Sequence, residues 1–293
     1  MNQKAANLSV RPLAEPLAAE IAGVDLAQPV NDATFKQIED AFHEHAVLVF
    51  RNQRLTPQAH IGFSRRFGDL LVHVLKQHND PEFPQVLVLS NIVENGKPIG
   101  IQDGGQYWHT DLSYTAEPSR CSLLYSVEIP FENGAALGDT LFVNTCAAYE
   151  ALSDSMKARL AGLRATHNYN ARYTRMQARG GTRVELDEDQ KKAVPEVVHP
   201  VVRTHPFTGR KSLYVNEGFT QSIVGMPAAE SERLLAELYE HVTDPRFMYR
   251  HRWQVGDLLM WDNCSTQHNA VANYGAHQRR HMRRTTVRGS APF

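Results

Sequence analysis

Residues 108–114 read WHTDLSY, and this stretch decides the fold and the chemistry that the sequence predicts. His109 and Asp111 stand two residues apart, so on a β-strand both side chains would point to the same face. The strand-like run GDLLMWDNCSTQH, residues 256–268, ends on His268. Two imidazoles and one carboxylate form the set that binds non-haem Fe(II) and leaves other coordination positions open. The sequence therefore predicts a metal site made of His109, Asp111 and His268.

The pair His-x-Asp also has an ordinary interpretation, a surface histidine beside a turn aspartate, because short motifs arise by chance. The strand-like residues that follow His109 and precede His268 favour the metal site. A structural zinc site would take four ligands, usually with cysteines, and the sequence has no Cys/His quartet with zinc-ligand spacing. Three ligands fit a catalytic metal with an open position.

The composition predicts a cytoplasmic protein with a large core. A chain of 293 residues can bury a substantial core, and without an internal repeat or a Gly/Ser-rich linker we expect one domain, 1–293. Its 31 basic and 32 acidic residues nearly cancel, which argues against a nucleic-acid or membrane partner. The N-terminus has no secretory h-region, and the odd set of Cys121, Cys146 and Cys264 indicates reduced thiols.

Caps and apolar spacing predict helices within residues 31–42, 56–67, 147–163 and 228–242. Apolar runs predict strands within 45–50, 85–92, 121–130, 138–144, 197–206, 211–219, 246–253 and 257–261. Asn95-Gly96 predicts a hairpin turn. Helices placed before and among many short strands predict a mainly β fold, an antiparallel, barrel-like core with helical buttresses. The mouth of such a barrel can hold a metal site.

The tail QRRHMRRTTV, residues 278–287, carries a second part of the predicted site. Arg280 and Arg284 are four residues apart, so a strand would aim both to one face. Facing the metal, Arg280 could hold the distal carboxylate of a dicarboxylate through a bidentate fork, and Arg284 could hold a second anion. The alternative is a solvated basic edge strand.

Several stretches together resemble the Fe(II)- and 2-oxoglutarate-dependent dioxygenases of the taurine and phenoxyacetate dioxygenase group. They run from about residue 10 to the C-terminus and include WHTD (108–111), GDT (138–140), YVNEGF (214–219), WQVGDLLMWDNCSTQH (253–268) and RRHMRRTTV (279–287). The resemblance implies a double-stranded β-helix, or jelly roll, in which His109, Asp111 and His268 are the catalytic iron ligands. It also implies that Thr140 and Arg280 bind 2-oxoglutarate. With O2 as second co-substrate, such an enzyme hydroxylates a small organic anion and releases succinate and CO2.

The resemblance also implies residues for the substrate. His73 and Arg284 match the positions that hold the substrate anion in taurine-type members, and Tyr173 and Phe219 match the aromatic walls. Without the resemblance, His73 would be an ordinary histidine and the two aromatic residues would be core.

The chain departs from the taurine pattern just before WHTD. The stretch DGGQY, residues 103–107, lacks the acidic and amide groups that would receive the taurine amine, and Lys76 stands where a tyrosine is expected. We therefore predict an anion without an ammonium group: a sulfonate, an alkyl sulfate or a carboxylate.

Other hypotheses remain open at this stage. An aryloxyalkanoate dioxygenase is the alternative substrate class, since residues 248–263 resemble that branch while VNEGF resembles the taurine branch. A non-catalytic jelly-roll binding protein would not need the intact ligand set. A zinc hydrolase is disfavoured by the two arginines and by the absence of H-E-x-x-H. The polar segment 168–198 predicts either a lid over the site or an exposed loop. The group also implies a homodimer or homotetramer.

Overall fold

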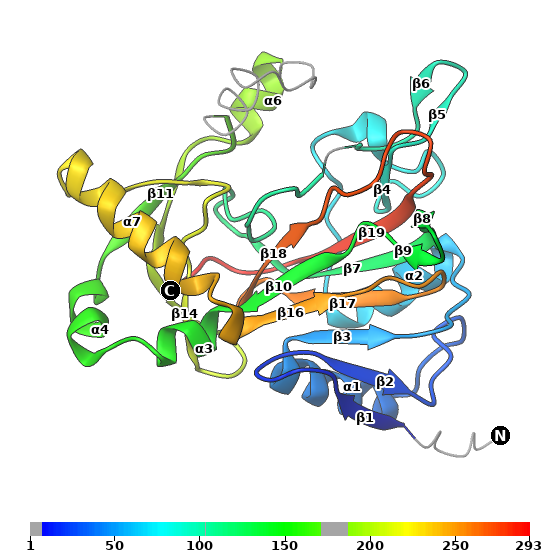
Figure 1. Cartoon of the computed structure of the whole chain (residues 1–293), viewed down its shortest axis with the longest axis horizontal. Helices are drawn as coiled ribbons and strands as arrows, with labels where there is room; N and C mark the ends of the chain where they lie inside the picture. Colours follow the sequence, from blue (N-terminus) through cyan, green and yellow to red (C-terminus); the bar gives the residue numbers. More distant parts are fainter. Residues whose placement is uncertain (1–7, 103, 171–186) are drawn as a thin grey trace.

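Two β-sheets packed against each other form the centre of the computed structural model, which describes residues 8–102, 104–170 and 187–293 (Figure 1). The larger sheet has seven strands in the order β1-β2-β3-β17-β7-β19-β4. Its pairs are antiparallel except β2 with β3. In that order the strands are Ser9–Pro12, Ala19–Ala22, Val47–Phe50, Leu258–Asp262, Ser119–Glu128, His281–Arg288 and Leu87–Ser90. The smaller sheet, β16-β10-β18, consists of Met248–His251, Thr140–Asn144 and Thr266–Ala270.

Successive side chains of the central strands point to opposite faces of the larger sheet, and they divide the core into two layers. In β3, Val47 and Val49 face the smaller sheet and pack with Phe142 of β10. Leu48 and Phe50 point the other way, into a cluster formed with the first two helices. All four β3 side chains are fully buried, so the strand is apolar on both faces, as its sequence predicts.

The first two helices cover the outer face of the larger sheet. Helix α1 (Asp32–His45) begins where the Asn31 side chain accepts from the Thr34 N–H, and α2 (Pro57–Ser64) begins after Thr56 with proline in its first turn. The 3-10 helix η1 (Arg65–Phe67) continues α2 and ends at Gly68. Both helices were predicted from these caps, which supply partners for the first free N–H groups of each helix.

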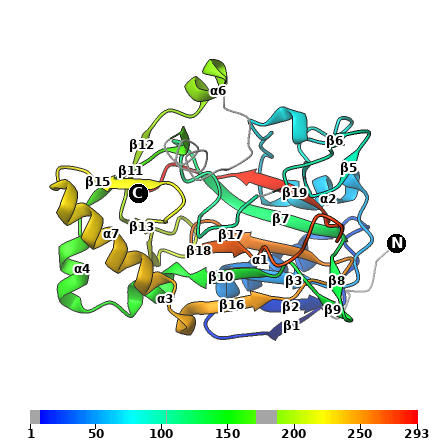
Figure 2. The same cartoon turned by 45° about the horizontal axis from the view of Figure 1, so that its top comes forward.

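A second group of elements packs at one end of the molecule, where Figures 1 and 2 both draw α3, α4 and α7 together. These helices are Thr145–Glu150, Asp154–Leu160 and Ala228–Val242. A sheet of β12 (Val197–Pro200), β11 (Arg164–His167) and β15 (Thr220–Ile223) and a hairpin of β13 (Val202–Thr204) and β14 (Lys211–Leu213) complete this end. Smaller elements are η2 (Lys76–His78), β5 (Val93–Glu94), β6 (Lys97–Pro98), β8 (Phe131–Glu132), β9 (Ala135–Ala136), α6 (Glu188–Ala193) and η3 (Pro245–Phe247). Asn95-Gly96 makes the predicted turn between β5 and β6.

The mainly β fold with helical buttresses is confirmed, and two expectations need correction. The described strands form open sheets, and no closed barrel is found among them. Residues 108–114 do not form a strand, because only His109 makes an isolated bridge and the chain then turns through Leu112, whose φ is 58°. Most of the predicted lid, 171–186, lies outside the described residues. None of the described helices is long and apolar enough to cross a membrane.

Candidate metal and co-substrate site

His109 and His268 meet through the backbone as well as through their rings. The His109 N–H donates to the His268 carbonyl at 3.1 Å, and the His268 N–H donates back at 2.9 Å. This single antiparallel bridge joins the 108–114 loop to β18 and sets the two ring centroids 4.1 Å apart. The spacing prediction therefore reached the right pair of ligands, although a bridge and a turn replace the expected strand.

The hydrogen bond on one ring nitrogen of His109 fixes which nitrogen is left for a metal. His109 Nδ1 lies 2.9 Å from the Tyr107 carbonyl oxygen, which can only accept, so Nδ1 carries the proton. In the neutral ring Nε2 then keeps its lone pair, and Nε2 lies 3.6 Å from Asp111 Oδ1. A backbone carbonyl holding the second nitrogen is the usual way in which a metal-binding histidine is oriented.

Asp111 lies in the turn and is held by two side chains of the larger sheet. Ser122 of β7 donates to Oδ2 at 2.7 Å, and Arg284 of β19 donates to Oδ1 at 2.9 Å. Burial alone would raise the pKa of Asp111, but Arg284 and the two histidines hold it well below its usual value. The group is therefore a carboxylate, the form that binds a metal.

His268 completes a buried group in which the three potential ligand atoms lie within 4.8 Å of one another. Burial lowers the pKa of His268 well below its usual value, so its ring is neutral. Its Nδ1 atom is buried and has no hydrogen-bond partner among the described residues. Two imidazoles and a carboxylate, with one ring nitrogen of His268 unsatisfied, fit the 2-His-1-carboxylate set of non-haem Fe(II).

A second buried group, His205, Asp262 and Cys264, has similar spacing but different hydrogen bonding. Two backbone N–H groups donate to His205 Nδ1 at 3.1 Å, so the proton of the neutral ring lies on Nε2, which donates to Asp262 at 2.6 Å. Burial raises the pKa of Cys264 well above its usual value and keeps the thiol protonated. This group therefore satisfies its own hydrogen bonds and does not offer the free lone pairs that a metal requires.

A cavity of about 90 Å³ adjoins the three potential ligands, and the predicted co-substrate residues Thr140 and Arg280 form part of its wall. Thr140 begins β10, where its Cα pairs with His251 on one side and Ala270 on the other. Arg280 precedes β19, and it lines the same cavity as Arg284, although the two arginines do not lie on one regular strand. Their predicted alternative, a solvated edge strand, is wrong, because β19 lies between β7 and β4.

Arg280 is a buried cation without a carboxylate partner among the ion pairs of the described residues. Its exposed fraction is 8%, and its Nε atom has no hydrogen-bond partner there. Burial lowers the pKa of Arg280 from its usual value. A buried guanidinium stays charged and costs free energy until an anion pairs with it. The cavity therefore offers a buried cation with which a ligand anion could pair.

The structure describes three of the four residues that were predicted to bind the substrate. His73, Phe219 and Arg284 line the cavity over the metal-ligand group, and Tyr173 lies outside the described residues. The Leu75 N–H donates to His73 Nδ1 at 3.1 Å, which places the proton of the neutral ring on Nε2. Phe219 packs against the His109 ring, with centroids 6.0 Å apart.

A larger cavity of about 540 Å³ shares His73, Leu87, Leu112, Tyr114 and Arg284 with the first. Half of its other lining residues are aliphatic: Leu71, Val72, Val74, Ala116 and Val194. Arg284 therefore lies where the cavity beside the metal ligands meets the larger cavity with its aliphatic side chains.

Several residues of the site were not predicted from the sequence. Ser122 touches a ligand, and Tyr107, Tyr114, Tyr169 and Tyr274 line the cavity. Tyr107 adjoins WHTD, so proximity to the motif could have identified it. Nothing in the sequence singles out Ser122, because its contact with Asp111 depends on how β7 lies beside the turn.

Comparisons with known proteins agree with this geometry. Residues 9–286 match the family model described as "Taurine catabolism dioxygenase TauD, TfdA family". The alpha-ketoglutarate-dependent 2,4-dichlorophenoxyacetate dioxygenase of Cupriavidus pinatubonensis is 36% identical over 94% of this chain and 96% of its own length. The alpha-ketoglutarate-dependent sulfate ester dioxygenase of Pseudomonas putida is 34% identical over 98% and 92%. A crystal structure of AAD-2 with Mn(II) and N-oxalylglycine superposes with a TM-score of 0.79 at 32% identity, covering 98% and 99%. The chain thus belongs to the TauD/TfdA family and is a 2-oxoglutarate-dependent oxygenase that uses Fe(II), 2-oxoglutarate and O2.

Proposed function

We propose that His109, Asp111 and His268 hold Fe(II) and that the enzyme hydroxylates an organic anion with an apolar body. The observation that carries the proposal is the convergence of three buried ligand side chains beside two cavities that meet at Arg284. Bound Fe(II) would supply the open coordination positions at which 2-oxoglutarate and O2 react, with release of succinate and CO2. Ser122 and the Tyr107 carbonyl would orient the ligands.

Thr140 and Arg280 would bind the distal carboxylate of 2-oxoglutarate. Both line the metal-side cavity, and the Arg280 fork can donate two parallel hydrogen bonds to a carboxylate. Pairing with the dianion would also remove the cost of leaving this guanidinium buried and unpaired. The two residues would thereby fix one end of the co-substrate while the metal binds the other.

Arg284 and His73 would hold the substrate anion, and Phe219 would form part of the wall. The buried Nε of Arg284 has no hydrogen-bond partner among the described residues, although its Nη1 pairs with Asp111. An anion at this junction could extend its body into the larger cavity, where aliphatic side chains such as Leu71 and Val74 offer a favourable place for alkyl or aryl carbon. Gly105, with φ of 78°, packs so closely that a Cβ there would lie 3.1 Å from the His109 ring. These features favour an alkyl sulfate, a sulfonate with an apolar chain or an aryloxy acid over taurine.

We infer further that the two sheets are the halves of a double-stranded β-helix and that residues 1–293 form one domain. In support, the metal-side cavity is lined from β10 and β18 of the smaller sheet and from β7 and β19 of the larger. A homodimer or homotetramer stays a prediction, which sedimentation equilibrium would test.

Anaerobic titration tests the assignment of the ligands. Adding Fe(II) and 2-oxoglutarate to the wild-type protein should produce the weak visible charge-transfer band of the chelate, and His109→Ala should abolish it. Arg280→Ala should weaken 2-oxoglutarate binding by about 2 to 5 kcal/mol, because one partner of a buried charged pair is removed. A wild-type protein without the band, or a His109→Ala variant that keeps it, would contradict the proposal.

Succinate formation across matched anions tests the substrate class. We expect hexyl sulfate, hexanesulfonate or phenoxyacetate to exceed taurine in kcat/KM. Ala116→Phe should fill part of the larger cavity and lower kcat/KM for the six-carbon chains more than for their methyl or ethyl analogues. Ala116→Ser serves as a control that leaves the volume almost unchanged. Taurine as the best substrate, or an equal effect of Ala116→Phe on long and short chains, would overturn this substrate class.

A further inference from the structure

The indole of Trp253 lies behind Thr140, on the side away from the cavity. Its Nε1 donates to Thr140 Oγ1 at 3.1 Å, and Trp253 itself does not line the metal-side cavity. We propose that Trp253 is a positioning residue for 2-oxoglutarate, which acts by turning the Thr140 hydroxyl proton toward the co-substrate carboxylate. This inference rests on the role of Thr140 in the proposed function.

The direction of the hydrogen bond follows from the chemistry of the two groups. An indole N–H is a donor and cannot accept, whereas a hydroxyl has one proton and two acceptor lone pairs. Thr140 must therefore accept from Trp253, and its single O–H remains for another partner. A carboxylate can only accept, so a Thr140 hydroxyl whose lone pair is already occupied by the indole is prepared to donate to it.

Strand register brings Trp253 to this place. Thr140 of β10 pairs with His251 of β16, and Trp253 follows two residues after His251. The indole is 1% exposed and packs in the core between the two sheets. The His251 ring meets the indole at 87°, with centroids 4.6 Å apart, which limits rotation of the indole.

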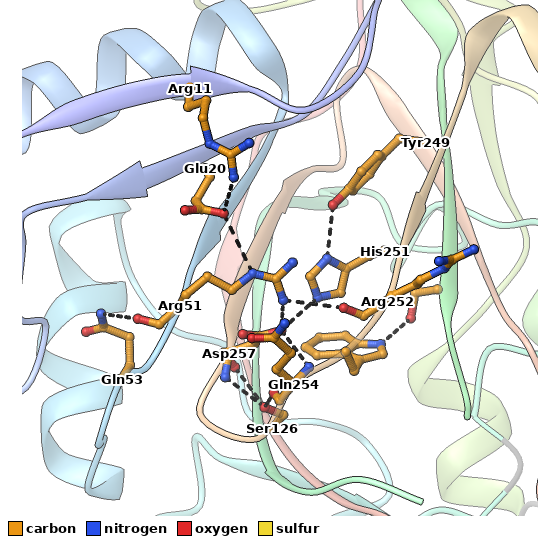
Figure 3. A network of polar contacts seen from close by, with 12 residues as sticks. Arg11, Glu20, Arg51, Gln53, Ser126, Tyr249, His251, Arg252, Gln254 and Asp257 are labelled. Carbon is orange, nitrogen blue, oxygen red and sulfur yellow. Dashed lines mark hydrogen bonds and ion pairs between the residues drawn. The ribbon is translucent and has the colours of Figure 1, made fainter. Parts of the chain in front are cut away.

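A polar network fixes His251 in turn (Figure 3). Tyr249 Oη lies 3.1 Å from His251 Nδ1, and Asp257 Oδ2 lies 3.2 Å from His251 Nε2. The same Asp257 oxygen pairs with Arg51, which follows β3, and Arg51 lies 3.8 Å from Glu20 of β2. The N-terminal strands thus support the co-substrate pocket through Asp257, His251 and Trp253.

Binding of N-oxalylglycine to the Mn(II)-loaded enzyme, measured by calorimetry, tests the inference without turnover. Trp253→Phe keeps an aromatic ring but removes the N–H, and we expect it to weaken binding about threefold to tenfold, the net worth of one hydrogen bond. The KM for 2-oxoglutarate should rise by the same factor, while kcat at saturating 2-oxoglutarate stays at the wild-type value. Replacing Trp253 with 3-benzothienylalanine, which keeps the indole shape without the N–H, should give the same result if phenylalanine disturbs folding.

A double-mutant cycle with Thr140→Val separates positioning from a general structural effect. Thr140→Val should weaken binding, and adding Trp253→Phe should weaken it no further, because the hydroxyl that the indole orients is gone. Tyr125→Phe is the matched control. Tyr125 donates a buried hydrogen bond of 3.0 Å to the Gln53 carbonyl and lines neither cavity. The Tyr125→Phe variant should therefore bind N-oxalylglycine as tightly as the wild type.

Three results would overturn the inference. Trp253→Phe and the benzothienyl protein could both bind as wild type, or Trp253→Phe could weaken binding equally with and without the Thr140 hydroxyl. Unchanged binding in Thr140→Val alone would instead refute the role given to Thr140 in the proposed function, and the inference with it.

Discussion

At the scale of single residues, Gly138 controls the place of the Arg280 side chain. Gly138 has φ of 75°, and a Cβ there would lie 3.0 Å from the Tyr274 ring and 3.2 Å from Arg280 Nε. The added methyl group of Gly138→Ala should therefore displace the Arg280 guanidinium. We expect binding of N-oxalylglycine, measured by calorimetry, to weaken at least tenfold. The left-handed backbone adds a stability cost of about 1 to 2 kcal/mol for alanine.

A substitution at Gly134 is the control that separates the backbone strain of alanine from its effect on Arg280. It has φ of 80°, but nothing lies within 4 Å of a Cβ built there. Gly134→Ala should lower the melting temperature about as much as Gly138→Ala does, yet leave N-oxalylglycine binding unchanged. Equal binding by the two variants would show that Arg280 does not need a glycine at residue 138.

At the scale of elements, strand β7 supports the metal site through one hydroxyl. Ser122 donates to Asp111 Oδ2 at 2.7 Å and also accepts from Asn263 Nδ2 at 3.1 Å. Partners of this kind orient a ligand, and their loss typically lowers metal affinity by about ten- to a hundredfold. Ser122→Ala should weaken Mn(II) binding in that range, measured by competition with a chelating dye.

Ser126, on the same strand, provides the comparison. Its hydroxyl is buried and donates to the Gln254 carbonyl at 2.6 Å, without touching Asp111. Ser126→Ala should therefore cost folding stability but keep the wild-type affinity for Mn(II). If both variants lost metal equally, the contact between Ser122 and Asp111 would have no special part in holding the site.

The elements also show what local sequence can predict. Helices α1 and α2 begin at the predicted caps because Asn31 and Thr56 bond to N–H groups only three residues away. The loop 108–114 was predicted wrongly as a strand, because its geometry comes from the bridge to His268 and not from its own residues. Local patterns thus predict elements whose partners are local, and they miss contacts such as that of Ser122.

At the scale of the whole molecule, the order of strands is set by contacts between distant segments. β17 lies between β3 and β7, and β19 lies between β7 and β4. This order brings Arg284 beside Asp111, whereas the sequence predicts only that Arg280 and Arg284 share a face. The resemblance predicts a role for each of these residues, but the two adjoining cavities follow only from the packed sheets.

Burial of His60 makes the stability of the whole fold depend on pH. Burial lowers the pKa of His60 to about 3, and the ring lies 3.1 Å from Thr285 Oγ1 in the core. In the unfolded chain the same ring would take up a proton near its ordinary pKa of about 6.5. The unfolded state therefore binds more protons between these two values, so the free energy of unfolding falls as the pH is lowered through this window.

His60→Gln should remove this contribution while it keeps a polar group near Thr285. Between about pH 7.5 and about pH 5, the loss of unfolding free energy should be smaller than in wild type by about 2 kcal/mol. Urea unfolding of the metal-free proteins at the two pH values measures it. Ser64→Ala breaks the neighbouring bond to Thr285, of 2.6 Å, without removing a titrating group, so it should lower stability equally at both. An unaltered pH dependence in His60→Gln would mean that His60 is not held neutral by the fold.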